Sequence, residues 1–253
     1  LWIRGGRLLD PSQGFDAPRD LLIDHLGLIE SLVQPASFRP APNDPRDVVD
    51  AKGLWVLPGL IDLHVHLRQP GQSKAETIDS GTRAAAAGGF TRIVCMPNTR
   101  PVLDTPARVA RLCERLRTEA RIHVHVAAAL SKNLAGAQAT DAQALAAAGA
   151  MVLSDDGLGT ESKGVLGRAL ASGMLVMVHA EDRSISAGGQ VAKGLAARRL
   201  GLPPWPARAE SVRVRRDLEI LREVGGRLHL QHLSTAGSIR ALRAAKEAGL
   251  SVS

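Results

Sequence analysis

After Pro58 the sequence repeats one pattern, in which a short apolar run is followed by a polar or glycine-rich loop and then by a helix-like stretch. Continuous apolar strands that alternate with helices are typical of a parallel sheet with helices packed on it. Six such units follow one another, and residues 250–253 have the pattern of an opening seventh strand. The six predicted strands end at His66, Met96, Leu130, Leu153, His179 and His232.

Two architectures satisfy this alternation, a (β/α)8 barrel and an open, doubly wound sheet. No Gly-x-Gly-x-x-Gly pattern opens the first helix, so nucleotide binding at the switch point of an open sheet has no support. We therefore predict an α/β fold in which residues 58–253 form a partial (β/α)8 TIM-like barrel of about six βα units plus the start of strand seven. We predict the first barrel helix from about Ser73 to Ala87, and a long glycine- and proline-rich segment over residues 188–206.

Residues 1–57 follow a different pattern, with short strands separated by turns and a proline-rich loop. We place a turn at Gly5–Gly6 between two strands, and a hairpin over residues 21–32. This segment is predicted to be a small N-terminal β-sandwich domain. It is too short to close a sandwich by itself, so we expect it to need partner strands from elsewhere.

The composition is that of an ordinary globular protein and argues against several classes of function. Hydrophobic residues make up 45% of the chain, but no apolar run approaches the roughly 18 residues of a membrane span. The net charge of +7 comes mainly from arginines scattered over helix-like segments, and tyrosine is absent, so we expect no nucleic-acid partner. Two cysteines, Cys95 and Cys113, are too few for a disulfide framework and suit a cytoplasmic location.

Histidines and a carboxylate stand at the ends of the predicted strands, where a barrel of this kind carries its reacting groups. His64 and His66 are separated by one residue, so their side chains point to the same side of the first strand. Such a pair alone is equally compatible with hydrogen-bonded core histidines. Asp156, His179 and His232 follow strands four, five and six, a placement that core histidines would not need. We therefore predict that these five residues bind metal.

Five ligands exceed the three protein ligands of a single catalytic zinc. The excess indicates two metal ions, a few ångströms apart, that share a bridging hydroxide, and such a site lowers the pKa of water and polarises a carbonyl. This is hydrolytic chemistry on an amide or an ester. The second His-x-His pair, His123 and His125, lies at the beginning of its strand, which is the wrong end for catalysis, and we predict a structural role for it.

Five motifs in this sequence occur in the order found in dihydroorotases of the amidohydrolase superfamily. They are Pro-Gly-Leu-Ile-Asp-Leu-His-Val-His-Leu-Arg (58–68), Met-Pro-Asn-Thr-Arg-Pro (96–101), Asp-Asp-Gly (155–157), His-Ala-Glu-Asp (179–182) and Gln-His-Leu-Ser-Thr (231–235). The first motif marks the superfamily, whereas the set is specific to dihydroorotase. The resemblance covers essentially the whole chain and implies reversible cyclisation of N-carbamoyl-L-aspartate to L-dihydroorotate in de novo pyrimidine biosynthesis, with two zinc ions per subunit.

The resemblance also implies a role for individual residues. His64 and His66 are similar to the ligands of the first zinc, and His179 and His232 to those of the second. Asp156 matches the carboxylate that bridges both metals, so the chain resembles the aspartate-bridged type and not the type bridged by a carbamylated lysine. Arg68 and Asn98 match residues that hold the carboxylate of a small anionic substrate, and a guanidinium offers a forked pair of donors for that purpose. We expect a homodimer and an association with aspartate carbamoyltransferase.

One expected motif is missing. The family carries an aspartate at strand eight that contacts the first zinc and moves the proton, and no position up to Ser253 matches it, so no residue of this chain is assigned as the catalytic acid or base. We therefore expect the sequence to represent part of a longer protein and to be inactive alone. Two alternatives stay open: another cyclic amidohydrolase such as a hydantoinase or allantoinase, and a non-catalytic dihydroorotase-like subunit that scaffolds aspartate carbamoyltransferase. Survival of all five visible ligands argues against the second.

Overall fold

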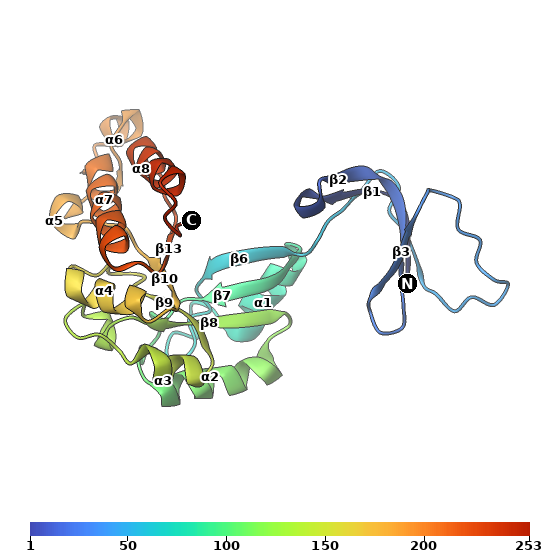
Figure 1. Cartoon of the computed structure of the whole chain (residues 1–253), viewed down its shortest axis with the longest axis horizontal. Coiled ribbons are helices and arrows are strands. Elements are labelled where there is room, and N and C mark those ends of the chain that lie inside the picture. The colour runs from blue at the N-terminus through green and yellow to red at the C-terminus, as the bar shows by residue number, and fades with distance from the viewer. The chain divides into compact units, whose positions relative to one another are not determined.

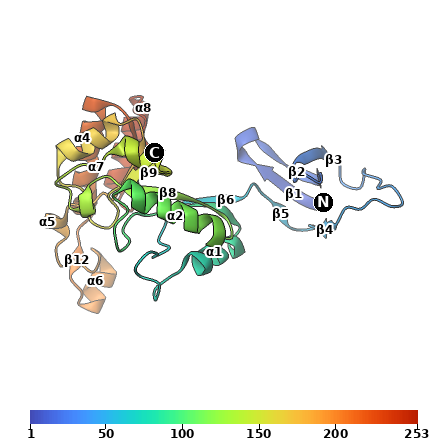
Figure 2. The same cartoon turned by 90° about the horizontal axis from the view of Figure 1, so that it is seen from below.

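The computed structural model describes residues 1–253 and divides into two compact units, Leu1–Leu60 and Ile61–Ser253. Figures 1 and 2 show the elements of each unit. Each unit has its own main sheet. No helix in either unit combines the length and apolar character that crossing a membrane requires.

The smaller unit is built on a five-stranded sheet in the order β3-β2-β1-β4, in which β5 also pairs with β1. The β1–β2 and β2–β3 pairs are antiparallel, whereas β4 and β5 run parallel to β1. The strands are β1 Trp2–Asp10, β2 Phe15–Ile23, β3 Ile29–Val33, β4 Val48–Asp50 and β5 Trp55–Val56. The hairpin predicted over residues 21–32 is therefore present as part of β2 and β3.

The turn predicted at Gly5–Gly6 is wrong, because β1 runs through both glycines with a shift in register between Ile3 and Gly6. Gly5 has a φ of 71°, a conformation that glycine adopts without steric cost, and its N–H donates to Asp20 Oδ1 at 2.7 Å. The same carboxylate accepts from the indole nitrogen of Trp2 at 3.3 Å. A β-bulge, satisfied by a side chain of the neighbouring strand, thus takes the place of a turn.

Asp20 is 1% exposed, so its loss leaves buried donors without a partner. We expect Asp20→Ala to lower the free energy of unfolding of the smaller unit by about 1–3 kcal/mol. Chemical denaturation followed by tryptophan fluorescence measures this change. The control is Asp16→Ala on the same strand, whose ion pair with Arg7 is half exposed and is expected to contribute less than about 1 kcal/mol. Equal effects of the two substitutions would contradict the role given to Asp20.

The larger unit contains a six-stranded sheet in the order β13-β10-β9-β8-β7-β6, and the four strand pairs from β7 to β13 are parallel. Its strands are β6 Leu60–Val65, β7 Phe90–Cys95, β8 His123–Ala129, β9 Ala150–Ser154, β10 Leu175–Val178 and β13 Arg227–Leu230. The strands follow one another in the sheet as they do in the chain, without the reversal that defines a doubly wound sheet. A parallel bridge between Leu228 of β13 and Val252 begins a seventh strand next to β13. The predicted TIM-like barrel architecture, with six βα units and the start of strand seven, is confirmed.

Six helices alternate with these strands along the chain, and Figure 1 shows α2 and α3 lying along one side of the sheet. They are α1 Ile78–Ala87, α2 Pro106–Glu119, α3 Ala142–Ala147, α4 Lys163–Ala171, α7 Ala207–Val224 and α8 Ala236–Glu247. Fully buried side chains pack between these helices and the sheet, including Ile78, Leu103, Leu145, Leu166 and Leu170. A smaller cluster lies on the other face of the sheet and consists of Val94, Met96, Ala127, Val152 and Met177. Alternate residues of each strand therefore supply two different clusters, as the period of a strand requires.

Two details of the chain path differ from the predicted pattern. Helix α1 begins at Ile78 and not near Ser73, because Thr77 caps it by accepting from the N–H of Ser80 and the Gln69 side chain accepts from the N–H of Ile78 at 2.9 Å. The glycine- and proline-rich segment contains short elements that are too brief to show a hydrophobic period. They are β11 Val191–Ala192, α6 Leu195–Leu200 and β12 Pro204–Trp205, and the short helix α5 Arg183–Ser186 precedes the segment.

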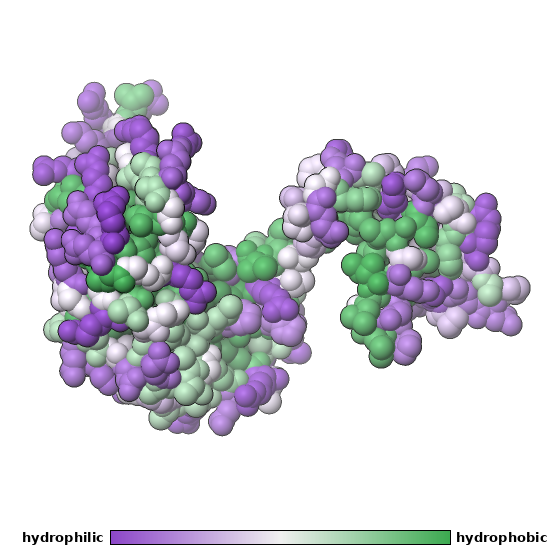
Figure 3. Space-filling model, in the orientation of Figure 1, coloured by the Kyte–Doolittle hydropathy of each residue, from purple (hydrophilic) through white to green (hydrophobic).

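The surface of the larger unit is mostly polar over its outer helices, whereas hydrophobic residues gather over β6 (Figure 3). Leu60, Ile61 and Leu63 on this strand are exposed. β6 is the edge strand of the sheet, which accounts for their exposure in this structure.

Candidate metal centre

Five side chains from four strands meet at the carboxyl edge of the larger sheet. His64 is on β6 and His66 directly follows it, while His179 directly follows β10. Asp156 and His232 each lie two residues beyond the ends of β9 and β13. Because parallel strands end at the same edge of a sheet, positions that are up to 168 residues apart in the chain converge here.

Asp156 lies at the centre of this group and is 3% exposed. On one side its carboxylate is 3.4 Å from His64 Nε2 and 3.5 Å from His66 Nε2, and these two nitrogens are 3.2 Å apart. On the other side it is 3.8 Å from both His179 Nδ1 and His232 Nε2, which are 3.1 Å apart. The structure thus brings together all five residues predicted as metal ligands.

The five residues form two triads that share one carboxylate. One triad is His64, His66 and Asp156, and the other is Asp156, His179 and His232. In each triad the ligand atoms lie within 4.8 Å of one another. Imidazole nitrogens and carboxylate oxygens are the ligands that zinc and related divalent metals bind, and three protein ligands per ion are typical of a catalytic site.

Neighbouring hydrogen bonds indicate which ring nitrogens of His66 and His179 carry protons. The nitrogens without protons are those that could bind a metal. Asn98 Oδ1, an acceptor, lies 3.0 Å from His66 Nδ1, and the Glu181 carboxylate lies 2.8 Å from His179 Nε2. The protonated nitrogens therefore face these partners. The lone pairs of His66 Nε2 and His179 Nδ1 face the centre, where each meets another imidazole nitrogen. These two lone pairs are available to bind a cation at the centre.

The charge distribution of the cluster favours an ionised carboxylate. Burial by itself would raise the pKa of Asp156, but hydrogen bonding from His232 and the charges of the surrounding histidines lower it below its usual range. Burial lowers the pKa of His64, which favours the neutral ring that binds metal. The Asp156 carboxylate raises the pKa of His232, against the opposing effect of burial.

The two residues predicted to hold the substrate differ in what they contact here. Asn98 bridges the cluster, since its Nδ2 donates to Asp156 Oδ2 at 3.0 Å while its Oδ1 faces His66. Arg68 is half-buried, has a φ of 58°, and takes part in none of the ion pairs around Asp156. The guanidinium is thus not committed to the cluster, whereas the Asn98 amide is.

Sequence reasoning missed two carboxylates that hold His179. Asp155 Oδ1 accepts from the N–H of His179 at 2.8 Å, and burial raises the pKa of Asp155. Glu181 contacts the ring of His179 and also accepts from Ser186. The available signal was proximity in sequence, because both acids belong to motifs that already contain a ligand. The direction of their side chains required the tertiary structure.

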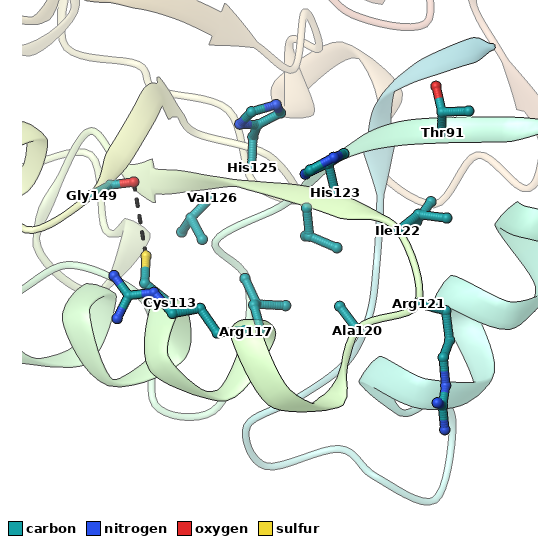
Figure 4. A pocket seen from close by; sticks show the side chains of 12 residues that line it. Thr91, Cys113, Arg117, Ala120, Arg121, Ile122, His123, His125, Val126 and Gly149 are labelled. Atoms are coloured by element: carbon teal, nitrogen blue, oxygen red, sulfur yellow. Dashed lines mark hydrogen bonds between the residues drawn. The ribbon is translucent and has the colours of Figure 1, made fainter. Parts of the chain in front are cut away.

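His123 and His125 are far along the strand from the triads and belong to neither. They line a cavity of about 700 Å³ at the beginning of β8, together with Cys113 and Arg117 of α2. Figure 4 shows the two rings projecting from one side of β8 and Cys113 and Arg117 lying on the other. Their structural role stays a prediction.

Comparisons with known proteins agree on one family. A family model described as dihydro-orotase-like matches residues 53–238. The chain is 42% identical over 256 residues to a dihydroorotase of Anaeromyxobacter dehalogenans (strain 2CP-C), an alignment that covers 100% of this chain and 58% of the relative. It is 41% identical over 254 residues to a dihydroorotase of Syntrophus aciditrophicus (strain SB), with 99% and 59% covered. The chain therefore spans less than two thirds of the length of these relatives.

Solved structures of similar fold include two cyclic-amide hydrolases. An L-hydantoinase from Arthrobacter aurescens superposes with a TM-score of 0.77 at 23% identity, over 99% of this chain and 56% of that structure. A dihydropyrimidinase from Brevibacillus agri NCHU1002 superposes with a TM-score of 0.72 at 26% identity, with the same coverage. Both likenesses extend over the small sheet and the larger one.

The shared carboxylate makes a prediction about metal binding. We expect Asp156→Asn to weaken binding of Zn²⁺ by both triads, because both lose an anionic ligand, whereas His66→Ala should weaken binding by one triad only. Zn²⁺ titration of the purified protein against a chromophoric chelator measures the number and affinity of sites. His125→Ala is the matched control and should leave both sites unchanged. Independent loss of one site in Asp156→Asn would show that the carboxylate is not shared.

Proposed function

Because this chain belongs to the dihydro-orotase-like family, we propose that the protein is a dihydroorotase, which interconverts N-carbamoyl-L-aspartate and L-dihydroorotate. The observation that carries the proposal is the pair of triads around Asp156 at the carboxyl edge of the sheet. Its donor set and geometry suit hydrolysis and formation of a cyclic amide, and similarity to dihydroorotases supports dihydroorotate as the substrate.

We propose that the triads hold two zinc ions per subunit, with His64 and His66 at the first position, His179 and His232 at the second, and Asp156 bridging them. Metal ions bound there would lower the pKa of water and polarise the reacting carbonyl. The protein's own contribution is to orient the ligands. Asn98 presents Nε2 of His66, Glu181 presents Nδ1 of His179, and the surroundings of Asp156 keep its carboxylate ionised.

Arg68 carries most of the proposed binding of the substrate carboxylate. A guanidinium presents parallel N–H donors that match a carboxylate. Arg68 forms no ion pair with the cluster that would have to break first. Asn98 would have to turn its Nδ2 away from Asp156 to reach the substrate, so its direct contribution should be smaller. The substrate is therefore proposed to be a small anion, held at one end by Arg68.

The first test is metal content and activity together. We expect the purified full-length protein to contain about two zinc ions per subunit and to cyclise carbamoyl aspartate. Prolonged chelation should abolish turnover, and zinc should restore it. Full activity of a stable, metal-free protein would refute the proposal. Parallel assays with dihydroorotate, hydantoin and allantoin separate the proposed function from the hydantoinase and allantoinase alternatives, and dihydroorotate should be the preferred substrate.

A second test addresses Arg68. Loss of charge-assisted hydrogen bonds of about 1.5–3 kcal/mol should raise KM for dihydroorotate by roughly 10- to 100-fold in Arg68→Ala, with zinc content unchanged. Arg68→Lys should recover part of the affinity, because the charge stays while the forked geometry is lost. Arg83→Ala on helix α1, where the side chain is 72% exposed, is the control and should behave as wild type. An unchanged KM in Arg68→Ala would place the substrate carboxylate elsewhere.

A homodimer and an association with aspartate carbamoyltransferase stay predictions from the family resemblance, and a cytoplasmic location stays a prediction from the cysteine content. Sedimentation analysis of the purified protein, alone and mixed with the carbamoyltransferase of the same organism, tests the two assembly predictions.

A further inference from the structure

Glu210, in the first turn of α7, accepts four hydrogen bonds from two consecutive residues of another segment. One carboxylate oxygen accepts from the backbone N–H and the hydroxyl of Ser234, both at 2.8 Å. The other accepts from the backbone N–H of Thr235 at 3.0 Å and from its hydroxyl at 2.7 Å. Both carboxylate oxygens are thus used to fix a stretch of two residues.

This stretch joins His232 to helix α8. Thr235 is the N-cap of α8, and its hydroxyl oxygen accepts from the N–H of Ser238 at 3.3 Å. Glu210 therefore places a negative charge beside the N-terminus of a 12-residue helix, where the helix dipole favours an anion. The hydrogen bonds from the 234–238 segment keep the pKa of Glu210 below its usual range although burial opposes this.

His232 itself has a strained backbone. Its φ of 39° lies in the left-handed region, which is uncommon for residues other than glycine and costs about 1–3 kcal/mol. Such a conformation persists only when the surrounding structure holds it in place. On the N-terminal side the N–H of Gln231 donates to the carbonyl of Val178 at 3.1 Å, which continues the sheet. On the C-terminal side the hydrogen bonds to Glu210 begin two residues later.

We propose that Glu210 is a positioning residue for His232, and the proposal rests on the metal centre proposed above. By holding Ser234 and Thr235, the carboxylate keeps the backbone of His232 in its strained conformation. That conformation directs Nε2 toward Asp156 and the second metal position. His232 is the exposed member of its triad, and no carboxylate outside the centre hydrogen-bonds to its ring as Glu181 does to the ring of His179.

The proposal is specific to one position of the centre. His179 is held by Asp155 and Glu181, and His66 by Asn98, so neither depends on Glu210. Loss of the Glu210 carboxylate should therefore weaken the second metal position and leave the first one intact. A residue that merely caps α8 would lower the stability of the fold without distinguishing between the positions.

The test is a double-mutant cycle on Zn²⁺ affinity, using competition with a chromophoric chelator. Glu210→Gln should weaken one of two Zn²⁺ sites by about 10- to 100-fold, a loss typical for partners that orient metal ligands, and should change the other site by less than about threefold. His232→Ala identifies the second position. In the His232→Ala background, Glu210→Gln should cause no further loss, because its effect passes through His232.

Asp141→Asn is the matched control. Asp141 caps α3 by accepting from the N–H of Ala144 at 3.0 Å, so this substitution removes the same charge from another helix N-terminus away from the triads. It should leave both Zn²⁺ sites as in wild type. Ser234→Ala removes one of the four hydrogen bonds without altering the carboxylate and should weaken the second site by only a few-fold. If Glu210→Gln folds poorly, the loss of affinity at the second site in Ser234→Ala tests the same proposal.

Three outcomes are distinguishable. If wild type lacks the Zn²⁺ site that His232→Ala should remove, the proposed metal centre itself fails. If wild type has both sites and Glu210→Gln binds Zn²⁺ like wild type, the centre stands and the role of Glu210 is refuted. Additive losses in the cycle, or equal losses at both sites, would assign Glu210 a general structural role and would also refute the proposal.

Discussion

The carboxylate of Asp156 is the interaction on which the rest of the site depends. It lies within 3.8 Å of ring nitrogens from four histidines, and it is almost fully buried. A buried carboxylate is costly unless cations or donors surround it. Here the surroundings come from strands β6, β9, β10 and β13, so the ligands are in place only once the parallel sheet has formed. Folding and assembly of the centre are in this sense one event.

The histidines around this carboxylate differ in the contacts that hold them in place. His66 and His179 each have a hydrogen-bond partner on the ring nitrogen that faces away from the centre. His232 depends on its backbone, which Glu210 holds through the following two residues. The two triads therefore differ in their support: a contact to a ring holds the first, whereas a strained main chain partly holds the second. Arg68 takes part in none of the ion pairs around Asp156.

Much of the fold could be predicted from the sequence because the barrel units have a strong local signal. The apolar runs located all six strands of the larger sheet to within two residues at their carboxyl ends, and the longer helices followed between them. Predictions failed where a specific side-chain hydrogen bond overrides the structure that the local sequence pattern indicates. Gly5–Gly6 has the composition of a turn, but the Asp20 carboxylate on the neighbouring strand makes it a bulge. Helix α1 starts late because Thr77 supplies its cap.

The sequence by itself determined which residues could form the site. Polar groups placed at the ends of apolar runs must converge in a parallel sheet, and this reasoning selected His64 over His123 although both belong to His-x-His pairs. Only the tertiary structure decided which groups support the ligands, because Asn98, Glu181 and Glu210 act through side-chain directions and loop paths that no periodicity encodes. Periodicity reports which face of an element a residue occupies, whereas a hydrogen bond across elements depends on distances set by packing.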